Sequence, residues 1–60
     1  MADEMSLAVV EGPKGTAEIV EVAETGKAPE YQVRINGQKH TYKSLGEAYI
    51  EAGQKAGVRT

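Results

Sequence analysis

The chain has 60 residues, no cysteine, and a formal net charge of −2. This length allows one small domain, and the lack of cysteine excludes a fold held by disulfide bonds and fits a cytoplasmic protein. The acidic start, residues 1–5, has no apolar run, and no stretch is long enough to span a membrane, so we expect neither a signal peptide nor a membrane protein.

Charge is distributed unevenly along the chain. Residues 1–30 contain seven acidic and two basic side chains, whereas residues 31–60 contain two acidic and five basic side chains. Such asymmetry permits a basic face on an acidic protein. The alternative is that both halves are ordinary solvated surfaces.

The first half of the chain predicts two strands. We expect a disordered tail at residues 1–5, a strand at 7–10, a turn at 12–15, a second strand at 16–23 and a loop at 25–29. In the second strand Ile19 falls on the face opposite Val20 and Val22. A covered second face or a dimer contact would explain this pattern.

Residues 31–42 predict a β-hairpin that reverses at Asn36-Gly37, because a two-residue turn of the mirror-image type needs positive φ at both central positions. With this turn, Val33 pairs with His40 and Arg34 with Lys39. The face predicted to meet the core carries Tyr31, Val33, Ile35, Gln38, His40 and Tyr42. The face predicted to meet water or a ligand carries Gln32, Arg34, Lys39 and Thr41, with Lys43 just beyond.

A helix is predicted over residues 44–57. Ser44 and Glu47 have the spacing of a capping box, and Gly57 fits the C-cap position. The residues at helical spacing that form the predicted apolar stripe are Leu45, Ala48, Tyr49, Ala52 and Ala56.

Together these elements predict an α+β fold in a single domain at 1–60: a three- to four-stranded antiparallel β-meander at 6–43 packed against one C-terminal α-helix. Eight of the hydrophobic residues are alanine, so the core is thin and the monomer marginal. Self-association or a bound partner would add the missing stability.

No catalytic constellation, metal site or cofactor site is expected, and we predict that the protein is not an enzyme. His40 is the only histidine, so a metal site built on it would lack a second nitrogen or sulfur ligand. The glycine-rich stretch 12–16 lacks the spacing of a P-loop, and Pro13 removes one backbone amide.

The Tyr-x-Val-Arg strand at 31–34, the Asn-Gly turn, the Tyr-Lys-Ser at 42–44 and the Glu-Ala at 47–48 resemble the DNA-binding domains of phage-type tyrosine integrases and of plant ethylene-response factors. The resemblance covers about residues 17–56. It implies a three-stranded sheet backed by a helix, with the exposed sheet face entering the major groove of double-stranded DNA. Glu18, Glu21 and Glu24 stand where those families tend to place basic or aromatic contacts.

Two functions follow as expectations. The first is a small non-enzymatic binding module that docks on a protein partner, such as a host factor, or on a second copy as a homodimer. The alternative is a DNA-binding accessory domain that uses the outer face of the 30–43 hairpin. In either case the predicted binding residues are Gln32, Arg34, Lys39, Thr41 and Lys43.

Overall fold

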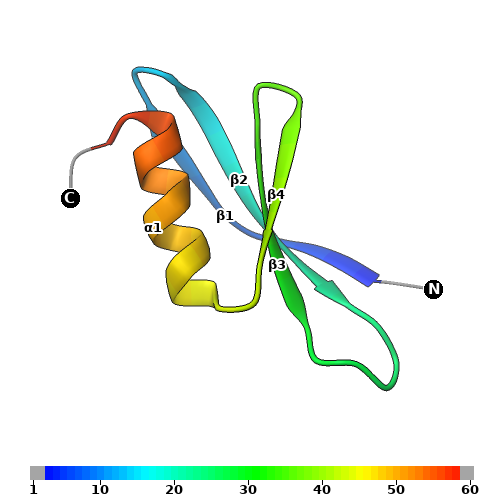
Figure 1. Cartoon of the computed structure of the whole chain (residues 1–60). Coiled ribbons are helices and arrows are strands. Elements are labelled where there is room, and N and C mark those ends of the chain that lie inside the picture. Colours follow the sequence, from blue (N-terminus) through cyan, green and yellow to red (C-terminus); the bar gives the residue numbers. More distant parts are fainter. Residues whose placement is uncertain (1–2, 59–60) are drawn as a thin grey trace.

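The chain folds into one antiparallel sheet of four strands with a helix on one face (Figure 1). The computed structural model describes residues 3–58. The elements are β1 (Asp3–Gly12), β2 (Gly15–Ala23), β3 (Glu30–Ile35), β4 (Gln38–Tyr42) and α1 (Leu45–Ala56). Strands that follow each other in sequence are neighbours in the sheet, so β1 and β4 form its two edges. The predicted α+β meander with a C-terminal helix is confirmed.

The β3-β4 hairpin has the predicted turn and register. Asn36 (φ 53°) and Gly37 (φ 78°) both adopt positive φ, as a mirror-image turn requires. Val33 pairs with His40 and is fully buried, while Arg34 pairs with Lys39 on the other face. The side chains of the hairpin are therefore divided between the two faces as the sequence predicts.

Both ends of α1 are capped by residues that the sequence indicates. The Ser44 hydroxyl accepts a hydrogen bond of 3.5 Å from the Glu47 backbone N–H. At the other end Gly57 adopts a left-handed conformation with φ 86°. Its N–H donates to the Gln54 carbonyl, and the Val58 N–H donates to the Gly53 carbonyl, which completes a Schellman motif.

A backbone hydrogen bond fastens the β1-β2 turn to the end of the helix. The Lys14 N–H donates to the Ala56 carbonyl at 2.9 Å. This bond satisfies one of the carbonyls that a helix C-terminus leaves without an intrahelical partner. In Figure 1 the helix accordingly lies over the end of the sheet near this turn, while the start of β1 and the β2-β3 loop extend beyond it.

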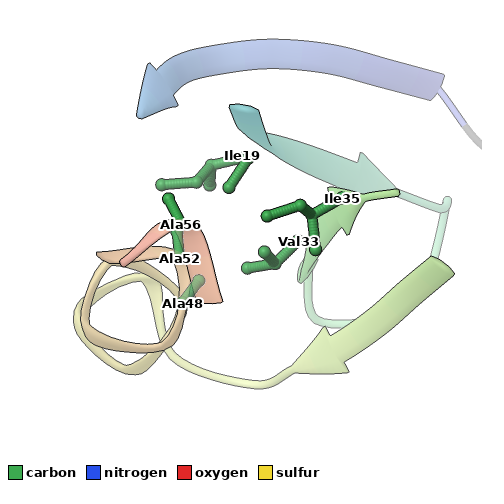
Figure 2. Close-up of a cluster of buried hydrophobic side chains, with 7 residues drawn as sticks. Ile19, Val33, Ile35, Ala48, Ala52 and Ala56 are labelled. Atoms are coloured by element: carbon green, nitrogen blue, oxygen red, sulfur yellow. The ribbon is translucent and has the colours of Figure 1, made fainter. Parts of the chain in front are cut away.

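The core lies between the helix and the sheet, and the helix contributes small side chains to it. Ala48, Ala52 and Ala56 recur every fourth residue and are all 0% exposed. Figure 2 shows them against the larger side chains of Ile19, Val33 and Ile35. Because alanine projects little, the helix backbone can approach the sheet closely.

Tyr49 was predicted to belong to the buried stripe, and that prediction is wrong. Its side chain is 44% exposed, and neighbouring Ile50 is 59% exposed. Ala48, Ala52 and Ala56 define the centre of the buried face, and Tyr49 lies on its flank. The buried stripe is thus narrower than the sequence pattern suggests.

The predicted tail at residues 1–5 is also wrong from Asp3 onward. Asp3, Glu4 and Met5 belong to β1, where they pair with Ala23, Val22 and Glu21 of β2. Met1 and Ala2 lie outside the described residues. Cross-strand pairing with the long β2, rather than local strand propensity, extends β1 to this point.

Candidate binding surface

The structure brings four of the five predicted binding residues onto one surface. Gln32 and Arg34 of β3 and Lys39 and Thr41 of β4 project from the sheet face opposite α1, which we term the open face. Lys43 is exposed but follows β4, in the connection to α1. These positions follow from the confirmed hairpin register, because side chains alternate between the two faces of a strand.

Arg34 is already paired within the protein. Its Nη2 lies 2.9 Å from Oε1 of Glu4 on β1 and 3.0 Å from Oε1 of Gln32, which also accepts from its Nε at 3.3 Å. Because the guanidinium donates to the Glu4 carboxylate and attracts its charge, the pKa of Glu4 is lowered. A ligand that used Arg34 or Gln32 would have to compete with these contacts.

The ion pair explains how the open face accommodates an apolar residue. Val20 is only 3% exposed although the helix covers the other side of the sheet. In the register, Arg34 is opposite Glu18 and Glu4 is opposite Val22, so the ion pair joins positions on either side of Val20. The Glu4–Arg34 ion pair therefore spans the position of Val20, the buried residue on the face opposite Ile19.

The open face is not cationic as a whole. Alternation from the observed pairings places four acidic and two basic side chains on it: Glu4, Glu11, Glu18, Glu30, Arg34 and Lys39. Of the three glutamates noted where the DNA-binding families place basic or aromatic contacts, only Glu18 is among these, since Glu21 projects from the helix side and Glu24 lies in the loop after β2. The sequence had already indicated Glu18, whereas Glu4 and Glu11 of β1 join this face only through the pairing of β1 with β2.

Three exposed large apolar side chains lie along β1, Met5 on the helix side of the sheet and Val9 on the open face, and sequence reasoning did not single them out. Met5 is 61% exposed, Leu7 37% and Val9 54%. β1 is ten residues long and lies at an edge, with β2 as its one neighbour in the described sheet. The sequence of β1 contains no Lys, Arg or Pro, and this absence is the pattern that could have indicated an exposed edge strand.

The opposite edge of the sheet is different. β4 has five residues, and its outward-facing Lys39 and Thr41 are exposed. Short length and lysine are features that protect edge strands from pairing with other chains. On β1, the protective features are a register shift between Ser6 and Ala8, since bulges disturb a ladder, and acidic side chains near the two ends of the strand. β1 is therefore the less protected edge.

Two hollows lie at the ends of the hairpins. One of about 280 Å³ is lined by Val22, Glu24, Lys27, Ala28 and Glu30, with Lys27 Nζ 3.4 Å from Glu24 Oε2. A second, of about 230 Å³, surrounds the Asn36-Gly37 turn. Both are small and open to water, and their charged residues are solvated rather than enclosed.

His40 and Tyr42 of β4 project from the helix side of the hairpin. His40 is half-buried opposite Val33. Burial raises the pKa of Tyr42, and the charges of Glu51 and Glu47 on α1 raise it further, so the phenol is held in its neutral form. Within residues 3–58, no three His, Cys, Asp or Glu side chains are grouped so that they could hold a metal ion.

None of the helical residues described here forms a segment with the length and apolar character needed to cross a bilayer. Comparison with known proteins finds no matching family model, no matching curated protein and no matching solved structure. The resemblance to the integrase and ethylene-response-factor domains stays a prediction.

Proposed function

We propose that this protein is a non-enzymatic protein-interaction module whose β1 edge receives an extended segment of a partner. The observation that carries the proposal is the combination of a long edge strand with the exposed side chains of Met5, Leu7 and Val9. An added strand bonds to the free backbone groups of an edge, and its side chains contact those of the edge strand. Both kinds of interaction are offered at β1.

The thin core gives such binding an energetic role. Among its fully buried side chains the largest are Ile19 and Val33, and the helix adds alanines. Covering exposed apolar surface on β1 would stabilise the domain by roughly 25 cal/mol for each Å² removed from water. The folded state and the bound state are therefore coupled.

The proposal is tested by selecting binders from a displayed library of random 12-residue peptides. Val9→Lys places a charge on the β1 edge, whereas Ile50→Lys places it on α1 at a similarly exposed position, 59% against 54%. Selected peptides should bind the wild type and Ile50→Lys equally, and should bind Val9→Lys at least tenfold more weakly. A selection without binders, or with binders that tolerate Val9→Lys, would contradict the proposal.

A second copy of this chain is one partner that could occupy β1, as in the predicted homodimer. Sedimentation equilibrium at micromolar concentration tests it. A dimer that dissociates in Val9→Lys but not in Ile50→Lys would show that the partner is the chain itself. A monomer at all concentrations would leave a foreign protein as the occupant.

The second candidate function is double-stranded DNA binding. Exposed Lys39, Thr41 and Lys43 along and just beyond β4 favour it. The Arg34–Glu4 ion pair and the carboxylates of the open face oppose it, because DNA affinity depends on cations that neutralise phosphates. Shifts of the 39–43 amides on adding duplex in low salt, lost in Lys39→Glu, would support it, and unchanged amides would reject it.

A further inference from the structure

The turn between β3 and β4 places two reactive groups next to each other. Asn36 is the only asparagine in the sequence, and Gly37 follows it directly. Both residues are exposed. A Cβ added to Gly37 would meet no atom within 4 Å, so this side of the turn is open to water. The side-chain amide of Asn36 and the backbone N–H of Gly37 therefore adjoin each other without a side chain on Gly37 to hinder a reaction between them.

These two groups can react without an enzyme. When a base removes the amide proton, the Gly37 nitrogen attacks Cγ of Asn36, forms a C–N bond and expels the side-chain nitrogen as ammonia, which leaves a cyclic imide. Water then opens the imide ring. Opening at Cγ gives aspartate, whereas opening at the backbone carbonyl carbon gives isoaspartate, in which the main chain runs through Cβ and Cγ. Either route consumes a water molecule and releases ammonia.

The folded turn holds the two groups in the wrong arrangement for this ring closure. The φ values of Asn36 (53°) and Gly37 (78°) are those of a mirror-image type I turn, in which ψ of the first residue is about +30°. At that ψ, Cβ of Asn36 and the Gly37 nitrogen lie nearly on opposite sides of the Cα–C bond, whereas the ring needs them on the same side. The turn must therefore open before the ring can close.

A contact with the neighbouring hairpin also fixes the Asn36 side chain. Its Oδ1 lies 3.2 Å from the position that a Cβ on Gly15 would take, so the amide of Asn36 is packed against the start of β2. This packing adds to the restraint that the backbone of the turn imposes.

We infer that Asn36 is a site of spontaneous deamidation, that opening of the β3-β4 turn controls its rate, and that the two products have different effects on the hairpin. Aspartate retains the turn, because Asp-Gly is a preferred pair for it, as Asn-Gly is. The new carboxylate lies in the hollow of about 230 Å³ that Arg34 and Lys39 also line.

Isoaspartate has the opposite effect. It adds a methylene to the main chain within the turn, so the two-residue turn that sets the register can no longer form. The pairing of Ile35 with Gln38 beside the turn is then lost. Since Ile35 and Val33 of the same strand are buried in the core, the isoaspartate form loses the hairpin and part of the core with it.

The rate is measured by incubating the protein at mildly alkaline pH, once folded and once unfolded in guanidinium chloride. Trypsin cleaves after Arg34 and Lys39, so the tryptic peptide of residues 35–39 carries Asn36, and mass spectrometry with fragmentation measures its conversion. We expect conversion to be at least tenfold faster in the unfolded chain and to accelerate as the pH rises. Equal rates in the two states would overturn the control by turn opening. An unfolded chain without conversion would overturn the site.

Two variants test whether the fold controls the rate. Val33→Ala removes buried methyl groups from β3 and should raise the rate several-fold in native buffer, because it destabilises the hairpin. Ile50→Ala shortens an exposed side chain of α1 and should leave the rate unchanged. In guanidinium chloride both variants should match the wild type. A native rate that is the same in Val33→Ala as in the wild type would contradict the inference.

The two products are tested separately. Asn36→Asp reproduces the aspartate form, and Asn36→Gly gives a Gly-Gly turn that cannot deamidate. Both should keep the amide shifts of paired β3 and β4, whereas the isoaspartate form, isolated by chromatography from aged wild type, should lose them. An isoaspartate form that retains the hairpin, or an Asn36→Asp variant that loses it, would overturn the effects assigned to the products.

Discussion

Gly12 is the residue at which the β1-β2 turn meets the end of the helix. A Cβ added there would overlap the carbonyl oxygen of Ala56 and lie 2.9 Å from both the Ala56 carbonyl carbon and a methyl of Val58. The Lys14–Ala56 hydrogen bond forms in the same place. Only the absence of a side chain lets these two backbones approach.

Gly12→Ala should therefore destabilise the domain, while Gly46→Ala should stabilise it. Overpacking that moves backbone costs about 1–3 kcal/mol. At Gly46 the added Cβ would meet only the Ser44 Oγ, at an ordinary 3.7 Å, and alanine in a helix is favoured by about 0.5–1 kcal/mol over glycine. Urea unfolding of both variants measures whether each one lowers or raises the free energy of unfolding. A stabilising effect of Gly12→Ala would contradict the close approach of the Gly12 backbone to that of Ala56.

The ion pair between Glu4 and Arg34 should make part of the stability depend on pH. The folded-state pKa of Glu4 lies below its ordinary value of 4.5, so the contribution is fully present above that pH. It is lost as the pH falls through the lowered pKa. Thermal unfolding should show Glu4→Gln less stable than the wild type at about pH 7, with the difference closing at about pH 2.

The control for this prediction removes the partner. In an Arg34→Met background, Glu4→Gln should have no such pH-dependent effect, because the lowering of the pKa originates mainly from the hydrogen bond and charge of Arg34. An undiminished effect in that background would assign the pH dependence to another group.

At the scale of elements, the small residues of α1 set its distance from the sheet. Ala52 is 0% exposed and lies in the middle of the buried face. Ala52→Leu should cost about 1–3 kcal/mol, since the added methylenes would push the helix away from Ile19 and Val33. Ile50→Leu, at an exposed position of the same helix, should change the free energy of unfolding by less than about 0.5 kcal/mol. Chemical denaturation compares them.

The elements that could be predicted from the sequence are those fixed by local chemistry. The Asn36-Gly37 turn sets its own register, and Ser44 and Gly57 mark the ends of the helix with caps. The start of β1 could not be predicted in this way, because Asp3, Glu4 and Met5 become a strand through pairing with β2. The helical spacing of apolar residues also could not predict that Tyr49 lies outside the buried face of α1, which is formed by alanines.

The candidate binding surface could be predicted only in part, because local chemistry fixes the hairpin but not the contacts between distant strands. Gln32, Arg34, Lys39 and Thr41 do share a face, as the hairpin register requires. Their pairing with a distant residue, Arg34 with Glu4, depends on the order of four strands, and only the assembled sheet defines it. The exposure of β1 likewise follows from its place at an edge.

At the scale of the whole molecule, binding at β1 should strongly raise the unfolding temperature. A ligand that binds only the folded state adds about 2.7 kcal/mol when its free concentration is 100 times its dissociation constant. In a domain of 60 residues, 1 kcal/mol shifts the midpoint by about 4–8 °C, so a peptide selected for binding at β1 should raise it by roughly 10–20 °C. Differential scanning fluorimetry with an added dye measures the unfolding midpoint without any native tryptophan.

At the same peptide concentration, Val9→Lys should show a much smaller rise in the midpoint and Ile50→Lys the full rise, because only the first variant changes the β1 edge. An equal rise in Val9→Lys would mean that the peptide stabilises the fold from some other surface.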